Sequence, residues 1–87
     1  MDLTELRGQI DEIDDEIIKL FCRRMDVAAQ VADYKKANNL PIFQPARERV
    51  KLQDVAEKAG PEMANYTRVL YSMLFELSRS YQSKRNR

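Results

Sequence analysis

The sequence of 87 residues contains no histidine and only one cysteine, two glycines and three prolines. Histidine is the commonest metal ligand and the usual acid or base at neutral pH. Its absence excludes Ser-His-Asp and Cys-His chemistry within the chain and speaks against a zinc site. The single cysteine, Cys22, allows no disulfide within the chain, so it is interpreted as a small core residue in a reducing compartment.

A strong net charge and a long apolar run are also missing. Fifteen basic and fourteen acidic residues leave a net charge of +1. Because no large electrostatic field surrounds such a domain, we expect neither a nucleic acid nor a membrane as its partner. No apolar run reaches the roughly 18 residues of a membrane span, and no secretory segment is present, so we expect a cytoplasmic protein.

The composition that remains is typical of an all-α protein. One-third of the residues are charged, 44% are hydrophobic, and β-branched runs are lacking. We expect a single domain over residues 1–87, with one very long, one short and one long helix at about 3–37, 45–58 and 62–83, and a basic tail at 84–87. Pro41 and Gly60-Pro61 mark the two breaks between these helices.

The first predicted helix carries an apolar stripe that this chain alone is too small to cover. Its members recur at steps of three and four: Leu3, Leu6, Ile10, Ile13, Ile17, Leu20, Val27, Val31 and Tyr34. At about 1.5 Å per residue the helix is roughly 50 Å long, whereas a compact chain of this size has a radius of gyration of about 12 Å. A small core is commonly supplemented by oligomerisation, so we expect an intertwined helical homodimer.

Two cations interrupt or adjoin this stripe. Arg24 stands where a hydrophobe is expected, and Lys35 follows 11 positions later, about 16 Å along the same side. Their side chains, leaning together, suit a small anion. Arg7 lies about 25 Å before Arg24 and can serve the same site only from another chain. The alternatives are a register-setting Arg24 paired with Asp26 or Glu48, and a solvated Lys35.

The other two predicted helices carry polar groups at helical spacing. Gln44, Arg47, Glu48 and Lys51 share one face of the second helix, and Ser78 and Gln82 lie one turn apart on the third. The combined set is poor in nucleophiles and bases but rich in donors for a di-anionic ligand. A solvated charge face is the alternative interpretation of Arg47, Glu48 and Arg49.

In the order and spacing of these residues, the whole chain resembles the all-helical class of chorismate mutase, an intertwined dimer of the shikimate pathway. The resemblance is carried by Leu6-Arg7-Gly8-Gln9-Ile10-Asp11-Glu12-Ile13-Asp14, Arg23-Arg24-Met25, Lys35, Arg47-Glu48-Arg49 and Ser78-Arg79-Ser80-Tyr81-Gln82. It implies that chorismate is rearranged to prephenate by an intramolecular [3,3] shift in aromatic amino-acid biosynthesis. It also implies that no cofactor is needed.

The resemblance implies a role for each polar residue. Arg24, helped by Ser78, binds one substrate carboxylate, and Arg7 of the other protomer binds the second. Lys35 contacts that second carboxylate and the ether oxygen, to which Gln82 also donates. Glu48 accepts a hydrogen bond from the ring hydroxyl, with the backbone around Gln44 assisting.

Two other functions are weighed against the mutase. An isochorismate pyruvate-lyase has the same fold with fewer polar residues around the second helix, and Arg47-Glu48 favours the mutase over it. A non-enzymatic helical dimerisation module would need none of the cations. Members of the class also occur fused to prephenate dehydratase or prephenate dehydrogenase, which the sequence leaves open.

Overall fold

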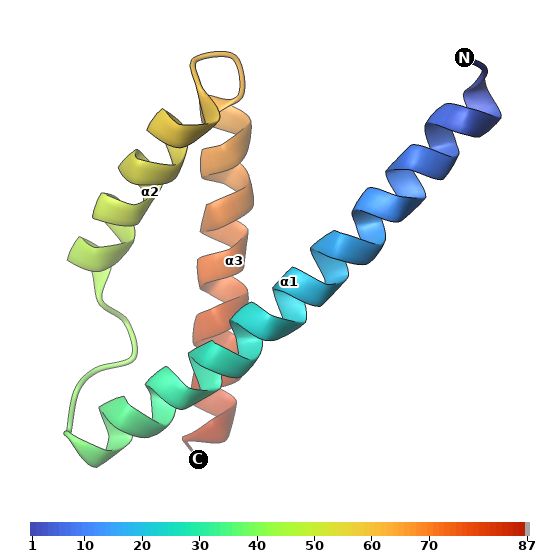
Figure 1. The fold of residues 1–87 in the computed structure, drawn as a ribbon. Helices are drawn as coiled ribbons and strands as arrows, with labels where there is room; N and C mark the ends of the chain where they lie inside the picture. The colour runs from blue at the N-terminus through green and yellow to red at the C-terminus, as the bar shows by residue number, and fades with distance from the viewer. Residues whose placement is uncertain (87) are drawn as a thin grey trace.

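A computed structural model describes residues 1–86 as three α-helices joined by two short connections (Figure 1). Helix α1 spans Leu3–Ala37, α2 spans Pro45–Ala59 and α3 spans Ala64–Arg85. The all-α class and the order of one very long, one short and one long helix are confirmed. Within residues 1–86, no helix combines the length and the apolar character that crossing a membrane requires.

The helix boundaries follow from local chemistry. Asp2 caps α1, because its carboxylate accepts a hydrogen bond of 2.9 Å from the backbone N–H of Glu5. At the other end Asn39 adopts a left-handed conformation with φ of 55°, and the N–H of Leu40 reaches back to the carbonyl of Lys35 at 2.8 Å. This pairing is a Schellman motif. It turns the chain sharply at Asn39, one helical turn after Lys35.

Proline and glycine mark the start and the end of α2, respectively. Pro45 occupies the first turn of α2, where a missing N–H is tolerated. Gly60 has a φ of 85°, a conformation that side chains disfavour, and it ends α2. Helix α3 therefore returns alongside α2 after a tight turn (Figure 1).

Helix α3 packs against both α2 and the second half of α1 (Figure 1). The core between them is small, and its buried apolar residues are mostly alanines: Ala28, Ala29, Ala32, Val55, Ala56 and Phe75. Small side chains let α1 and α3 approach closely where they cross. Such a core is thin for a stable fold of this size.

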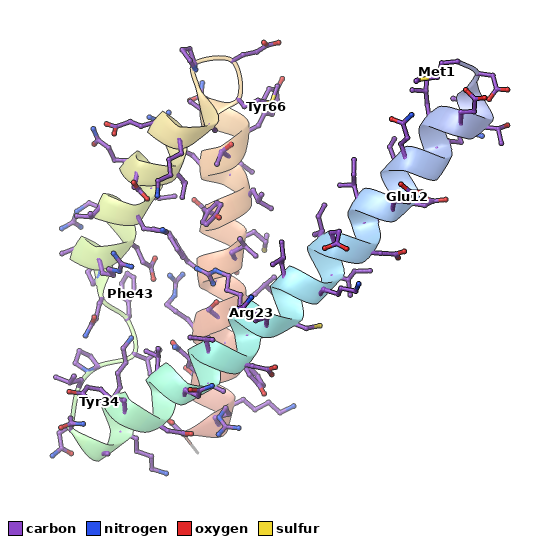
Figure 2. The ribbon with its side chains drawn as sticks, viewed as in Figure 1. Met1, Glu12, Arg23, Tyr34, Phe43 and Tyr66 are labelled. Carbon is purple, nitrogen blue, oxygen red and sulfur yellow. The ribbon has the colours of Figure 1, made fainter. Side chains whose placement is uncertain are left out.

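The first half of α1 projects beyond the other helices, as Met1 and Glu12 show in Figure 2. The structure is 54 Å long, with a radius of gyration of 16.0 Å. The projecting stripe is 43–60% exposed at Leu3, Leu6, Ile10, Ile13, Ile17 and Leu20. Cys22 is exposed as well, so its interpretation as a core residue is wrong for the single chain.

The end of the chain differs from the sequence prediction. Helix α3 begins at Ala64 rather than near residue 62, and it continues to Arg85 rather than ending near 83. Lys84 and Arg85 therefore belong to the last helical turn and not to a frayed tail, whereas Arg87 lies outside the described residues. Arg85 donates to Asp33 of α1 at 3.1 Å, and this contact raises the pKa of the guanidinium.

Candidate functional site

A pocket of about 330 Å³ lies among α1, α2, α3 and the connection between α1 and α2. Its lining consists of thirteen residues: Arg24, Val27, Ala28, Val31, Lys35, Ile42, Gln44, Arg47, Glu48, Lys51, Phe75, Ser78 and Gln82. Four of them are cations and one is an acid. This charge balance, in a pocket at the small end of the usual range for ligands, suits a small anion.

Arg24 enters the pocket from the middle of α1. Its Nη1 donates to the Ser78 hydroxyl at 2.8 Å, and its guanidinium carbon lies 5.8 Å from the centre of the Phe75 ring. These contacts orient the guanidinium and use one of its five donors. The alternative pairing of Arg24 with Asp26 or Glu48 is not what the structure shows.

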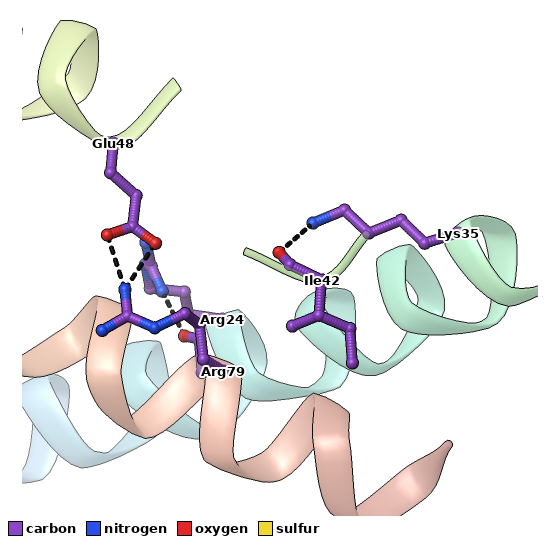
Figure 3. Close-up of polar contacts among 6 residues, drawn as sticks. Arg24, Lys35, Ile42, Glu48 and Arg79 are labelled. Carbon is purple, nitrogen blue, oxygen red and sulfur yellow. Dashed lines mark hydrogen bonds and ion pairs between the residues drawn. The ribbon is translucent and has the colours of Figure 1, made fainter. Parts of the chain in front are cut away.

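Lys35 is fixed at the opposite end of the pocket. Its ammonium donates to the Ile42 carbonyl at 2.8 Å, across the turn that ends α1 (Figure 3). One of its three N–H donors is used in this way, and two are left for a ligand. Lys35 is half-buried, which contradicts its interpretation as a solvated helix end, whereas the neighbouring Lys36 is exposed.

Glu48, the one acid of the lining, is held by Arg79 of α3. Nη1 of Arg79 donates to both carboxylate oxygens (Figure 3). The same guanidinium lies 4.8 Å from the centre of the Phe43 ring, in the connection before α2. Arg79 thus joins α3, α2 and the connection behind the pocket wall.

Gln82 is buried one turn after Ser78 on the inner face of α3. Its amide nitrogen donates to the Ala28 carbonyl of α1 at 3.0 Å. An amide nitrogen has two N–H donors, so the second is left for the pocket. The sequence predicted this pair of α3 residues from their spacing, and the structure brings both to the same cavity.

Helix α2 supplies the outer wall. Gln44 is half-buried, and its carbonyl accepts from the N–H of Glu48 at 3.2 Å, which begins the helix. Arg47 is exposed at the rim, and Lys51 is half-buried one turn further on. Lys51 also lies 3.4 Å from Asp54, which contacts Lys58 at 2.9 Å.

The contact with Lys58, supported by Lys51, lowers the pKa of the Asp54 carboxyl. A carboxyl whose pKa falls on folding stabilises the protein above the ordinary value near 3.8, and this contribution is lost as the pH falls below it. We therefore expect Asp54→Asn to lower stability slightly at pH 7 and by less at pH 3. Urea unfolding of both chains at the two pH values tests this, and an equal difference at both would contradict it.

Arg7 is the one predicted site residue that lies apart. It is exposed on the projecting half of α1 and is absent from the pocket lining. A second, largely apolar groove lies between α1 and α3, with a volume of about 410 Å³. Its lining is Ile17, Leu20, Phe21, Arg24, Leu70, Tyr71, Met73, Leu74 and Leu77.

Sequence reasoning did not assign Lys51 to the pocket lining or Arg79 to the contact behind it. Lys51 shares the helical face of Gln44, Arg47 and Glu48, so its spacing was the available signal. Arg79 has no such signal, because its contact with Glu48 depends on how α3 packs against α2. Among residues 1–86, no group of three or more cysteines and acids is placed to hold a metal ion.

Comparison with known proteins extends these observations. Residues 6–83 match the family described as chorismate mutase type II. The T-protein of Haemophilus influenzae is 44% identical over 61 residues, which cover 67% of this chain and 16% of that protein. A chorismate mutase of Methanocaldococcus jannaschii is 45% identical over 47 residues, which cover 54% of this chain and 48% of that protein.

A third relative is the 4-amino-4-deoxychorismate mutase of Streptomyces venezuelae. It is 33% identical over 46 residues, which cover 53% of this chain and 45% of that protein. The chain thus spans less than half the length of each of these three relatives. No solved structure matches the chain significantly.

Proposed function

This chain belongs to the chorismate mutase type II family, and from that premise we propose that it rearranges chorismate to prephenate as a single mutase domain. The observation that carries the proposal is the pocket, which gathers Arg24, Lys35 and Glu48 with fixed donors from α3. Chorismate has two carboxylates, one ring hydroxyl and an ether bond. The pocket offers cations for the carboxylates, an acceptor for the hydroxyl and donors for the ether oxygen.

We propose that binding begins with the carboxylates. Arg24 and Ser78 hold one of them, and the unused donors of the Arg24 guanidinium make a charge-assisted contact. Lys35, at the other end, takes part in holding the second. A substrate fixed at both ends has its enolpyruvyl arm placed over the ring, and such positioning supplies a large part of the rate enhancement of a reaction within one molecule.

The chemical step would use electrostatic stabilisation and no proton transfer. As the ether C–O bond breaks, negative charge grows on its oxygen, where Lys35 and the second N–H of Gln82 can donate. Both groups are already oriented, Lys35 by the Ile42 carbonyl and Gln82 by the Ala28 carbonyl. Oriented donors need no reorganisation during the reaction, which is what makes them effective.

Glu48 would accept a hydrogen bond from the ring hydroxyl. As the only acid of the lining, it repels both carboxylates and so favours one orientation of the ring. Gln44 supports this wall through its backbone contact with Glu48. A retained acceptor for the ring hydroxyl favours the mutase over the pyruvate-lyase.

We further propose that two chains assemble into an intertwined homodimer in which Arg7 of each completes the pocket of the other. The exposed stripe of α1 and the apolar groove between α1 and α3 are complementary in character. Each would be covered by the projecting helix of a second copy. In a twofold dimer, two equivalent sites result.

The direct test is the rate at which purified protein consumes chorismate, followed by absorbance, beside the same assay with isochorismate and a size measurement in solution. We expect prephenate formation by a dimer. Faster conversion of isochorismate would favour the pyruvate-lyase. A dimer that converts neither would favour the dimerisation module.

Replacement of Gln82 tests the ether contact. In Gln82→Glu, the new carboxyl faces the Ala28 carbonyl in a buried position, and both conditions raise its pKa. Only the protonated form can donate to the ether oxygen. We therefore expect kcat/KM to fall at pH 8 and to recover as the pH is lowered to 5, and a pH profile like that of the wild type would remove Gln82 from the ether site.

A further inference from the structure

The pair formed by Arg79 and Glu48 gives the pocket wall a charge property that the proposed reaction does not use. Glu48 lines the pocket, but Arg79 does not. Arg79 reaches the carboxylate from behind the wall and donates to both of its oxygens. Any ligand group that contacts Glu48 therefore meets a carboxylate with a cation directly behind it.

The position of Arg79 is well defined by its surroundings. Its guanidinium lies over the Phe43 ring at 4.8 Å, a geometry in which a cation and an aromatic face attract. The side chains of Arg79 and Glu48 are 32% and 22% exposed, respectively. Because both are mostly buried, solvent and salt screen their charges less than they screen surface charges.

We infer that Arg79 is a positioning residue that sets substrate specificity: by offsetting the charge of Glu48, it makes the pocket favour a neutral donor on the ligand ring over a cationic one. The inference rests on the proposed function, in which Glu48 contacts the ring hydroxyl. The two ligands compared are chorismate, which has a ring hydroxyl, and 4-amino-4-deoxychorismate, the compound in the name of the relative from Streptomyces venezuelae.

The physical basis is the charge of the two ring substituents. A hydroxyl is neutral, whereas an alkyl amine, like that of lysine, is protonated at neutral pH. A lone carboxylate would attract an ammonium more strongly than a hydroxyl. With Arg79 behind Glu48 that advantage is offset, because two cations about 6 Å apart in a partly screened site repel enough to change affinity about tenfold.

The test is the ratio of kcat/KM for 4-amino-4-deoxychorismate to kcat/KM for chorismate, measured at pH 7 on one preparation. In Arg79→Gln we expect this ratio to rise about tenfold above that of the wild type. The folded fraction cancels in such a ratio, so partial unfolding does not imitate the effect. Arg79→Met, which can still pack on Phe43, should raise the ratio in the same direction.

Two control variants separate charge from structure. Arg79→Lys retains the cation and should keep the ratio near that of the wild type. Arg68→Gln removes a charge from an exposed position of the same helix and should also leave it unchanged. A ratio that stays at the wild-type value in both neutral Arg79 variants, or one that rises equally in Arg79→Lys, would overturn the inference.

The wild-type assay distinguishes this failure from failure of the proposed function. Turnover of chorismate with no change of ratio on substitution would overturn only the role of Arg79. A wild-type chain that prefers the amino compound would likewise overturn only the role of Arg79. A chain that converts neither compound would overturn the proposed function and the inference together.

Discussion

Arg24→Ala is expected to lower kcat/KM for chorismate by a hundredfold or more. Arg24 is the cation that binds a substrate carboxylate in the proposed mechanism, and it is already oriented by Ser78 and the Phe75 ring. Loss of one preorganised donor from such a site typically costs about 3 kcal/mol of transition-state stabilisation. Steady-state kinetics of the purified variant measure the loss, with circular dichroism and a size measurement to show that the fold persists.

The adjacent arginine provides a matched control. Arg23 is exposed and does not line the pocket. Arg23→Ala removes the same charge from the same helix and is expected to change kcat/KM by less than about threefold, as surface substitutions generally have small effects. Similar losses in both variants, or a loss below tenfold in Arg24→Ala, would mean that Arg24 does not bind the substrate.

Much of this site could be predicted from the sequence because it is built on helix periodicity. A regular helix fixes the direction of each side chain, so an arginine within an apolar stripe must point toward whatever the stripe packs on. Arg24 and Lys35 were placed together in this way, as were Ser78 and Gln82. Spacing along single helices paired the residues within each helix, and the resemblance to the chorismate mutase family joined the two pairs at one site. The structure brings all four to one pocket.

The remaining features depend on contacts between helices, which periodicity does not specify. Whether Glu48 pairs with Arg24, with Arg79 or with solvent is decided by how α2 and α3 pack, and the structure selects Arg79. The end of α3 was misjudged for a similar reason. A run of basic residues resembles a solvated tail, but Asp33 of α1 provides a partner for Arg85.

The proposed contribution of Arg7 to a neighbouring pocket predicts that two inactive variants regain activity when their chains form a hybrid dimer. Arg7→Ala and Arg24→Ala are each expected to be inactive alone, with losses of a hundredfold or more. In a hybrid of the two variants, the pocket of the Arg7→Ala chain has an intact Arg24 and receives an intact Arg7 from its partner. The second pocket of the hybrid lacks both arginines. One working site per hybrid dimer should result.

When equal amounts of the two variants exchange at random, about half of all dimers are hybrids. Each hybrid has one working site of two, so the mixture should regain about one quarter of wild-type activity. Coexpression of the two variants with different affinity tags allows the hybrid to be purified and assayed alone.

A mixture of Arg24→Ala with Lys35→Ala is the matched control. Both residues line the pocket of one chain, so every site in that hybrid keeps one defect and no activity should return. Recovery in this control, or none in the Arg7 and Arg24 hybrid, would show that each pocket is not shared between two chains as proposed.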